Sequence, residues 1–502
     1  MPNTQYELLA AVDLGSNSFK LQVARVVENQ LYMLDALKEP VRLAAGLTAD
    51  KHLDDASRRR SLDCLTRFGE RLKGFAKGAV RCVGTSALRQ AKDAPSYIDN
   101  AEAALGFPIE IIAGREEARL IYVGVAHSLP ASQERRLVVD IGGGSTECIV
   151  GKGVKPVIME SLNMGCVNFS RRYFPEGRID KTSMKQAILA ARTEAQGIAA
   201  AYQGQWAEAI GSSGTARALA DILELNGLSG GGITSDGLDR LRDLMVRAGH
   251  VQALQLAGLK GDRLPVIAGG FAIMAGVFTE LGIRRMSSAT GALREGILYE
   301  QLGRFHHADM RLSTVAEFMR RYHVDAVQAE RVRRLSLALF DQVAPLIGND
   351  IDACRQFLDW AARLHEIGIS IAHASYHKHG AYILQNADMP GFSRSDQARL
   401  SLLVRTQRGG LAKVQALMPT AVEPVGPDDL LLIQILRLAV LFHRSRQDIA
   451  LPTMTLQRQD RGCKLLLPAA WLEQNLLART ELEAEENDWK GMGLVFKFRQ
   501  AA

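Results

Sequence analysis

Two glycine-rich turns, each preceded by an aspartate at the end of an apolar run, constrain the fold of this chain more than any other feature. The first turn spans residues 13–18 (DLGSNS) and the second residues 140–145 (DIGGGS), and another apolar run follows each of them. Glycine and short polar residues allow a tight reversal, so the pattern predicts strand, turn, strand at both places. One such turn is equally consistent with an ordinary hairpin, but its recurrence favours a shared chemical role.

Turns of this composition can bind an anion. Consecutive backbone N–H groups converge on a phosphate where side chains are small, and hydroxyl groups add further donors. An aspartate beside the phosphate can hold Mg²⁺ or a water molecule. The candidate phosphate-binding residues are Asp13, Gly15, Ser16, Asn17, Ser18, Gly142, Gly143, Gly144 and Ser145.

Two common nucleotide-binding classes do not fit these turns. The G-x-x-x-x-G-K-[ST] motif of P-loop NTPases is absent, because Gly151-Lys152 lacks the rest of it. The triple glycine does not read G-x-G-x-x-G, and it leads into a predicted strand, whereas a Rossmann fold would open a helix there. A P-loop NTPase and a Rossmann oxidoreductase are therefore disfavoured.

Composition predicts a multidomain protein of the reducing cytoplasm. The chain has 502 residues, 47% hydrophobic and 23% charged, and no stretch that we expect to cross a membrane. Its start lacks the features of a signal peptide. Its six cysteines are scattered without C-x-x-C spacing, as expected for reduced, packed thiols. We expect a cytoplasmic protein without a transmembrane segment, and peripheral association with a membrane stays open.

The charge balance favours an anionic partner. The net charge is +6 and the isoelectric point is near 9.0, although solvated basic faces are common. Aromatic residues make up only 6% and do not alternate with basic runs, which argues against single-stranded nucleic acid. We expect no nucleic-acid partner, whereas a long inorganic polyanion would need only the charge.

The order of predicted elements indicates a duplicated α/β architecture followed by a helical part. The first half contains a hairpin, helices over 57–75 and 96–105 and strands over 80–84 and 109–112, and a second unit with the same opening begins near residue 136. Beyond residue 299, long stretches have helical spacing. The end reads as strands over 454–458, 463–467 and 494–498 around a helix over 469–485. We place domains at 1–125, 126–303, 304–450 and 451–502.

The joint set of motifs resembles the exopolyphosphatase and guanosine pentaphosphate phosphohydrolase family of the actin-like ATPase superfamily. The landmarks are AAVDLGSNSFKLQVARV, VGTSALRQAKD, IIAGREEARLIYVGV, VVDIGGGSTE, MGCVNFSRRYF, GSSGTARAL, GALREGILYE and LHEIGISIAHASYHKHGAYILQNADMPGF. The resemblance runs nearly end to end. It implies two ribonuclease-H-like lobes with a cleft between them, a helical domain like that of HD phosphohydrolases, a small α+β C-terminal domain and a homodimer.

Asp140 and Glu147 are the candidate ligands of a magnesium ion. They flank the second turn seven residues apart, so they lie on the two limbs of a hairpin and can face one ion. Mg²⁺ takes few protein carboxylates and keeps waters, so two suffice. The alternative is that Glu147 is an ordinary strand residue at the protein surface and binds no metal. A monovalent cation such as K⁺ is a possible second cofactor.

Glu116 and Glu117 follow Gly114 at the start of a predicted helix. Neighbouring helical residues point about 100° apart, so only one of the two can face the cleft. The helix N-terminus favours the ionised carboxylate that a general base requires. The same pair would also complement the helix dipole with no catalytic role. The resemblance implies that Glu117 activates the attacking water.

A third segment with a small polar turn and a helix start runs through Thr85, Ser86 and Arg89. Small residues at a helix N-terminus offer N–H donors to phosphate, and arginine adds a bidentate fork. The resemblance implies that Arg89 binds phosphate. Weaker phosphate-site candidates are Lys20, Arg42, Thr85, Ser86 and Gly214. Gly214 lies where relatives in the superfamily hold adenosine, and we expect that segment to pack and close the cleft.

The helical domain lacks the pattern of an active HD enzyme. Glu366 follows His365 where the resemblance would place an aspartate, and His443 stands near the position of a late aspartate. His373, His377 and His379 are further candidate ligands. We expect a degenerate domain, with metal binding as the less favoured alternative.

The resemblance implies a Mg²⁺-dependent exopolyphosphatase that removes terminal orthophosphate processively from inorganic polyphosphate. The alternative within the family is hydrolysis of guanosine pentaphosphate to guanosine tetraphosphate, and the net positive charge mildly favours the longer polyanion. An ATP-dependent kinase or ATPase would share the turns but needs an adenosine pocket. A noncatalytic sensor would bind without turnover, which conflicts with the joint presence of Glu117, Asp140 and Glu147.

Overall fold

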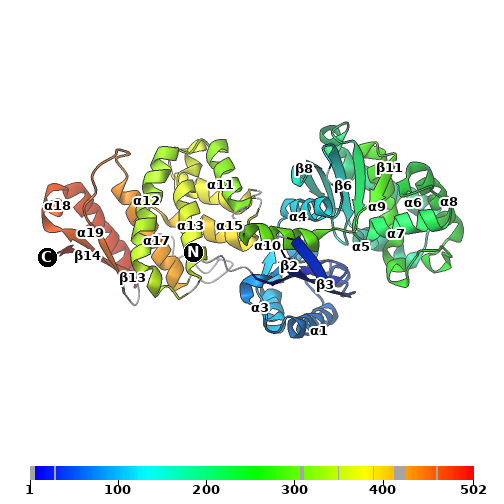
Figure 1. Ribbon diagram of the computed structural model, residues 1–502, viewed down its shortest axis with the longest axis horizontal. Coiled ribbons are helices and arrows are strands. Elements are labelled where there is room, and N and C mark those ends of the chain that lie inside the picture. The colour runs from blue at the N-terminus through cyan, green and yellow to red at the C-terminus, as the bar shows by residue number, and fades with distance from the viewer. Residues whose placement is uncertain are drawn as a thin grey trace. The chain divides into compact units, whose positions relative to one another are not determined.

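The computed structural model describes residues 6–27, 30–130, 132–305, 310–348, 350–387, 389, 391–411, 426–459 and 462–501. The chain divides into two compact units, Met1–Asp309 and Met310–Ala502. Unit 1 is coloured from blue to green in Figure 1, and unit 2 from yellow-green to red.

Unit 1 contains two lobes that share one strand topology. In lobe I the order is β3-β2-β1-β4-β5, with β1, β2 and β3 antiparallel and β4 and β5 parallel to β1. Lobe II repeats it as β8-β7-β6-β9-β11, with β10 added beyond β11. The duplicated α/β architecture is thereby confirmed. The strands are β1 (Leu8–Leu14), β2 (Phe19–Val27), β3 (Gln30–Glu39), β4 (Val80–Gly84), β5 (Ile109–Ile111), β6 (Arg135–Ile141), β7 (Thr146–Lys152), β8 (Lys155–Leu162), β9 (Glu208–Ser212), β10 (Ile233–Thr234) and β11 (Arg285–Ser288).

The two glycine-rich turns occupy equivalent positions in the lobes. Pairing of β1 with β2 sets Asp13 opposite Lys20, and pairing of β6 with β7 sets Asp140 opposite Glu147. Residues directly opposite each other in an antiparallel pair point to the same face of the sheet. Each hairpin therefore presents one pair of polar side chains beside its turn.

Helices cover both sheets. Lobe I and the seam between the lobes contain α1 (Asp55–Arg71), α2 (Ser86–Gln90), α3 (Ala94–Leu105), α4 (Gly114–His127) and α10 (Leu293–Phe305). Lobe II contains α5 (Cys166–Tyr173), α6 (Lys181–Tyr202), α7 (Ser213–Leu225), α8 (Ser235–Ala248) and α9 (Ile267–Leu281). The helix expected to reach Phe75 ends at Arg71, shortly before Gly74, whose φ is +93°.

α4 and α10 form a core between the two sheets. Their apolar side chains, among them Ile121 and Ile297, pack with Ala11 of β1 and Val138 of β6 in one buried cluster. α10 also contacts β1 and β2, and α4 contacts β7 and β8. The seam between the lobes is thus built from the helix that begins near Glu117 and the last helix of unit 1.

One helical stretch among the described residues, 261–281, is long and apolar enough to cross a membrane by length and composition, with a mean hydropathy of 1.7. The sequence analysis did not expect so long a stretch. In the fold, 72% of it is buried, and α9 packs against α5 and α6. Its apolar character is that of a core helix in lobe II.

Unit 2 is helical, with a small sheet at its C-terminal end. Its helices include α11 (Met310–Arg321), α12 (Ala326–Val343), α13 (Ile351–Leu364), α14 (Tyr376–Asn386), α15 (Arg394–Thr406), α17 (Pro427–Phe442), α18 (Ala469–Gln474) and α19 (Leu476–Gly491). The sheet order is β12-β13-β14, made of Thr455–Gln459, Gly462–Pro468 and Val495–Ala501. The single helix expected over 469–485 is two helices, because Asn475 has a non-helical backbone (φ −122°, ψ 60°).

Candidate active site

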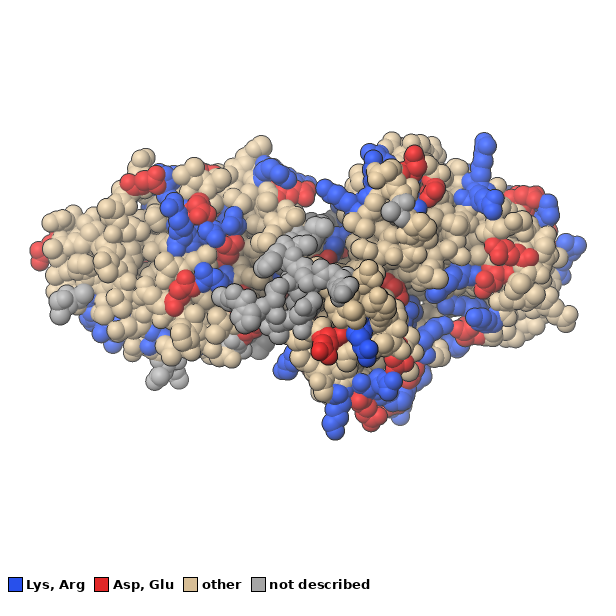
Figure 2. Space-filling view, viewed as in Figure 1, with Lys and Arg blue, Asp and Glu red and all other residues tan. Residues whose placement is uncertain are grey.

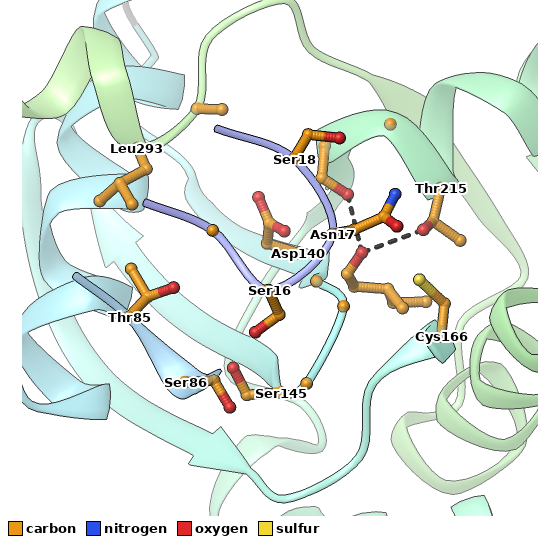
Figure 3. A pocket seen from close by; sticks show the side chains of 18 of the residues that line it. Ser16, Asn17, Ser18, Thr85, Ser86, Asp140, Ser145, Cys166, Thr215 and Leu293 are labelled. Atoms are coloured by element: carbon orange, nitrogen blue, oxygen red, sulfur yellow. Dashed lines mark hydrogen bonds between the residues drawn. The ribbon is translucent and has the colours of Figure 1, made fainter. Parts of the chain in front are cut away.

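The two glycine-rich turns touch each other across the cleft of unit 1. A Cβ atom on Gly143 would lie 2.9 Å from the Cβ of Ser16, and one on Gly144 would lie 3.0 Å from the Oγ of Ser16 and 2.6 Å from the Oγ of Ser86. A side chain at Gly143 would displace Ser16 and Asn17 of the opposite turn, and one at Gly144 would displace the hydroxyl groups of Ser86 and Ser16. Figure 3 shows Ser16, Ser86 and Ser145 gathered at this meeting point.

The pocket at this point contains most of the predicted site residues. From the sequence predictions it is lined by Asp13, Gly15, Ser16, Asn17, Ser18, Lys20, Thr85, Ser86, Glu117, Asp140, Gly142, Gly143, Gly144, Ser145 and Gly214. Three predicted residues, Arg42, Arg89 and Glu147, are not among its lining residues. Arg89 pairs with one lining residue, Glu117, and Glu147 lies opposite another, Asp140, in the hairpin.

The second turn is held from behind by lobe II. The carbonyl oxygen of Ile141 accepts hydrogen bonds from the hydroxyl groups of Ser213 (3.1 Å) and Thr215 (3.0 Å), which Figure 3 marks with dashed lines. The carbonyl of Gly142 accepts from the backbone N–H of Cys166 at 2.9 Å. These bonds fix the turn in place, as a preorganised anion site requires.

The first turn is held by the backbone of Arg42. Its N–H donates to the carbonyl of Asn17 at 2.8 Å, and the N–H of Ala44 donates to the carbonyl of Ser16 at 2.9 Å. Arg42 has a left-handed backbone (φ 54°) and its side chain is exposed. In this structure Arg42 therefore contributes through its main chain.

Glu117 and Arg89 form a close ion pair at the wall of the pocket. The Nη1 atom of Arg89 lies 2.7 Å from Oε2 of Glu117 and donates to the carbonyl of Ile112 at 2.9 Å. Both side chains are largely buried: that of Arg89 is 12% exposed and that of Glu117 is 10% exposed. Arg89 thus reaches the carboxylate of the candidate base, at the edge of the phosphate-binding turns.

Glu116 points elsewhere. Its two carboxylate oxygens accept from Nε and Nη2 of Arg119, each at 2.8 Å, inside the seam with α10. Only Glu117 of the two lines the pocket. One glutamate of the pair faces the cleft and the other does not, as the helical geometry predicts.

Glu147 is held by a residue that the sequence analysis did not identify. Its Oε1 accepts a hydrogen bond of 2.8 Å from the hydroxyl of Ser161 on β8, and the side chain is 1% exposed. Ser161 also lies against the start of α4, since a Cβ on Gly114 would come within 2.7 Å of it. No local motif marks Ser161, because its partner is set by the pairing of β7 with β8.

Buried carboxylates raise one another's pKa values here. Burial raises the pKa of Glu117, with Asp13 and Asp140 adding to the effect, while Arg89 lowers it. Burial, and next to it the charges of Glu117 and Asp140, raise the pKa of Glu147 well above its usual value. Burial likewise raises the pKa of Asp140, opposed by Ser212 and Lys20. The cluster carries more negative charge than Arg89 and Lys20 offset.

The donor set of the cluster fits a hard divalent cation. Asp140 and Glu147 offer carboxylate oxygens on one face of the hairpin, and their mutual repulsion is of the kind that a cation relieves. Within the part of the chain that the structure describes, no three Asp, Glu, His or Cys side chains are grouped as a metal site on their own. Mg²⁺ needs only one or two carboxylates and completes its shell with water and phosphate oxygens.

Arg263 is a second residue that the sequence analysis missed. It lines the pocket from the 3₁₀ turn Gly261–Val266, and a Cβ on Gly214 would lie 1.7 Å from its Nη2 atom. Its guanidinium group therefore packs on the backbone of Gly214. A lone arginine ahead of an apolar helix gives no sequence signal of this contact.

One ion pair joins the lobes beside this arginine. Lys38 of β3 lies 2.9 Å from Asp262, the residue before Arg263, and both side chains are 42% exposed. The side-chain hydrogen bond from Lys38 is the largest influence that lowers the pKa of Asp262. The pair is separated by 224 residues in sequence, so only the fold brings it together.

The described histidines of unit 2 form no group of three or more His, Cys, Asp or Glu side chains that could hold a metal ion. His365 is buried, with Nδ1 2.7 Å from the carbonyl of Ala362, and Glu366 pairs with Arg446. Arg446 also reaches Asp325 at 3.2 Å. The Glu366 carboxylate is thus paired with a guanidinium group, and the expectation of a degenerate domain stays a prediction.

Comparison with known proteins gives consistent matches along the chain. The model of the Ppx/GppA phosphatase family matches residues 22–305, and that of Ppx/GppA phosphatase domain III matches residues 310–486. A guanosine-5′-triphosphate,3′-diphosphate pyrophosphatase of Aeromonas hydrophila is 38% identical over 495 residues, covering 98% of this chain and 99% of the relative.

Solved structures share the fold of unit 1. An exopolyphosphatase of Cytophaga hutchinsonii superposes with a TM-score of 0.53 at 24% identity, covering 59% of this chain and 97% of that one. A Ppx/GppA family member of Aquifex aeolicus gives 0.50 at 23% identity, with 59% and 98% covered. The two-lobed actin-like fold expected from the sequence is confirmed.

Proposed function

The chain belongs to the Ppx/GppA phosphatase family and is a hydrolase of phosphoanhydride bonds, and on this premise we propose that it removes the 5′-terminal phosphate of guanosine pentaphosphate. The observation that carries the choice of substrate is the match over nearly the full length of both chains to the Aeromonas pyrophosphatase. Guanosine pentaphosphate, which the sequence alone favoured less than polyphosphate, is therefore the first candidate substrate.

The geometry supports hydrolysis at one end of a phosphate chain. The turns at Gly15–Ser18 and Gly142–Ser145 line one pocket, so the terminal phosphoryl group would lie between them. Their N–H and hydroxyl groups would stabilise its charge, and Lys20 would add a cation. Positioning and electrostatics are what phosphoryl transfer demands of a protein.

Glu117 would orient and deprotonate the attacking water. Its pKa is raised by burial, which makes the carboxylate a stronger base than an exposed one. Arg89 holds that carboxylate in place at 2.7 Å. General-base assistance of this kind contributes roughly 10²- to 10⁴-fold in rate.

Asp140 and Glu147 would hold Mg²⁺ beside the second turn, with Ser161 orienting Glu147. When bound, the ion supplies positive charge to the phosphate oxygens. The two facing carboxylates support a site there, and the remaining ligands would be water and phosphate.

The wall at Gly214 argues against an ATP-dependent kinase. Ser213 and Thr215 use their hydroxyl groups to hold Ile141, and the guanidinium of Arg263 packs on Gly214. The segment thus closes the pocket where an adenosine site was considered. Arg263 instead offers a charged fork to the phosphates that remain on the leaving nucleotide.

The test is orthophosphate release with Mg²⁺ from guanosine pentaphosphate and from long-chain polyphosphate in parallel. We expect the higher kcat/KM for the nucleotide, and loss of both activities in Glu117→Ala. Glu194→Ala, which removes an exposed glutamate on α6, is the matched control and should behave as the wild type. A wild-type protein that releases phosphate from neither substrate would contradict the proposal.

Inorganic polyphosphate is the second candidate, and the net charge of +6 favours it. On the face drawn in Figure 2, however, Lys and Arg side chains are interspersed with Asp and Glu. A continuous basic track would serve a long polyanion better. A higher kcat/KM for polyphosphate in the parallel assay would promote this candidate.

The proposal includes three further properties: a homodimer, a requirement for a monovalent cation and a cytoplasmic location. A homodimer is checked by sedimentation at several protein concentrations, and a monovalent-cation requirement by replacing K⁺ with a bulky organic cation. Cytoplasmic location, with or without peripheral membrane association, is checked by fractionation of cells.

A further inference from the structure

The helix that carries Glu117 is joined to α10 by a buried ion network that the proposed reaction does not use. Arg119 donates to both carboxylate oxygens of Glu116 at 2.8 Å, and its Nη2 lies 3.0 Å from Oε2 of Glu300 on α10. The exposed fractions are 2% for Arg119, 3% for Glu116 and 9% for Glu300. The network thus connects the residue next to Glu117 with a different helix.

The same two helices meet at the level of their backbones. A Cβ on Gly296 of α10 would lie 1.8 Å from the carbonyl oxygen of Leu120, and one on Gly124 would lie 2.1 Å from that of Ala292. Such close packing leaves little freedom for α4 to slide or tilt. The orientation of its first turn is then set by side-chain contacts, among which is the ion network at Glu116.

Glu116 and Glu117 are adjacent on one helical turn, so their side chains point about 100° apart. Any rotation of the turn that moves Glu116 also changes the direction of Glu117 relative to the pocket that it lines. Arg119 is nearly fully buried between two carboxylates, and removing one of them changes the charge balance of a buried ion network, which is costly in the interior. Loss of Glu300 would therefore pull Arg119, and Glu116 with it, toward a new arrangement.

We propose that Glu300 is a positioning residue for the reaction, acting through Arg119 and Glu116 to set the orientation of Glu117. This positioning role depends on the proposed function in one respect, namely that Glu117 is the base. Glu300 lies outside the residues that line the pocket, so its effect should fall on turnover and spare substrate binding.

The test compares Glu300→Gln with Asp93→Asn in the full chain. Asp93 pairs with Arg58 of α1 in the same unit, so its loss costs an ion pair without touching α4. For the substrate that the wild type hydrolyses, we expect kcat to fall roughly 10- to 100-fold in Glu300→Gln, the scale of a misplaced catalytic group. KM should stay within about twofold, and Asp93→Asn should keep its kcat. An unchanged kcat, or an equal fall in both variants, would overturn the proposal.

Two additions keep the test decisive. Glu300→Asp retains the charge, and it should recover part of the lost kcat even if Glu300→Gln folds poorly. Hydrogen exchange of a peptide over residues 113–121 should quicken in Glu300→Gln and stay unchanged in Asp93→Asn. This readout does not need turnover, so unchanged exchange rejects the positioning role, whereas a wild type without phosphate release rejects the proposed function alone.

Discussion

Arg89 Nη1 lies 2.7 Å from Oε2 of Glu117 and 2.9 Å from the carbonyl oxygen of Ile112. The arginine is the nearest cation to the candidate base, and it lowers the pKa of Glu117 against the effect of burial. Its position makes the ionisation of Glu117 dependent on Arg89.

Replacing Arg89 by alanine should therefore move the acidic limb of the kcat/KM profile to higher pH. The rate needs the ionised carboxylate, and without the cation the already raised pKa of Glu117 rises further. The measurement is the pH dependence of kcat/KM for both proteins. Arg115→Ala, at the start of the same helix but directed to the carbonyl of Met159, is the control. An acidic limb that stays in place would contradict this role.

Replacing Glu147 by glutamine should stabilise the metal-free protein at neutral pH while abolishing activity. The raised pKa means that the fold disfavours the ionised form, so this group's stabilisation is full below its unfolded pKa and is lost as pH rises through the folded value. At pH 7 to 8, the neutral amide of glutamine avoids the free-energy cost of an ionised carboxylate at this buried position. We expect a higher Tm by about 2 °C or more, whereas Glu160→Gln, at a half-exposed position on β8, should change little.

Magnesium should raise the Tm of the wild type and have a smaller effect on Glu147→Gln. A ligand that binds only the folded state stabilises it by mass action, and the variant lacks one of the two proposed carboxylate ligands. Thermal melts with Mg²⁺ and with a chelator measure this. Equal shifts in the two proteins would place the ion elsewhere.

Reversal of one charge in the Lys38–Asp262 pair should weaken substrate binding, and reversal of both should restore it. The pair lies beside Arg263 and closes the lobes at that point. As an exposed pair it contributes at most about 1 kcal/mol, so we expect a several-fold higher KM for Asp262→Lys that fades as salt is added. A double variant, Lys38→Asp with Asp262→Lys, that performs no better than the single one would contradict the idea.

His377 should make the protein sensitive to acid. Burial, followed by the charges of Arg408 and Arg405, lowers its pKa to about 4. The neutral ring is favoured in the fold, so stability is lost as pH falls from the ordinary value of 6.5 toward 4. Melting temperatures across this interval should fall less for His377→Asn than for the wild type, and the exposed His373→Asn should follow the wild type.

The site features that could be predicted from sequence are those fixed by short stretches of chain. The turns at Gly15 and Gly142 are encoded in a few residues, and the seven-residue spacing of Asp140 and Glu147 already implies a facing pair. The choice between Glu116 and Glu117 needed the resemblance, because helical geometry alone says only that one of them faces the cleft.

The features that escaped prediction depend on distant contacts. Ser161 orients Glu147 because β8 pairs with β7, and Arg263 lines the pocket with its guanidinium group packed on Gly214. Neither residue has a local pattern that marks it. The apolar stretch over 261–281 is different, because its length and hydropathy can be read from the sequence, and only its burial against α5 and α6 depends on the fold.

The pairing of Asp13 with Lys20 in lobe I, against that of Asp140 with Glu147 in lobe II, breaks the symmetry of a duplicated fold. Two identical hairpins would give a phosphate chain no reason to enter in one direction. The lysine of lobe I lines the pocket, whereas the glutamate of lobe II lies on the same face of its hairpin as Asp140. For a bound phosphate chain and its counter-ion, this difference would give the two lobes opposite electrical character, and a duplicated scaffold would gain a defined direction of attack.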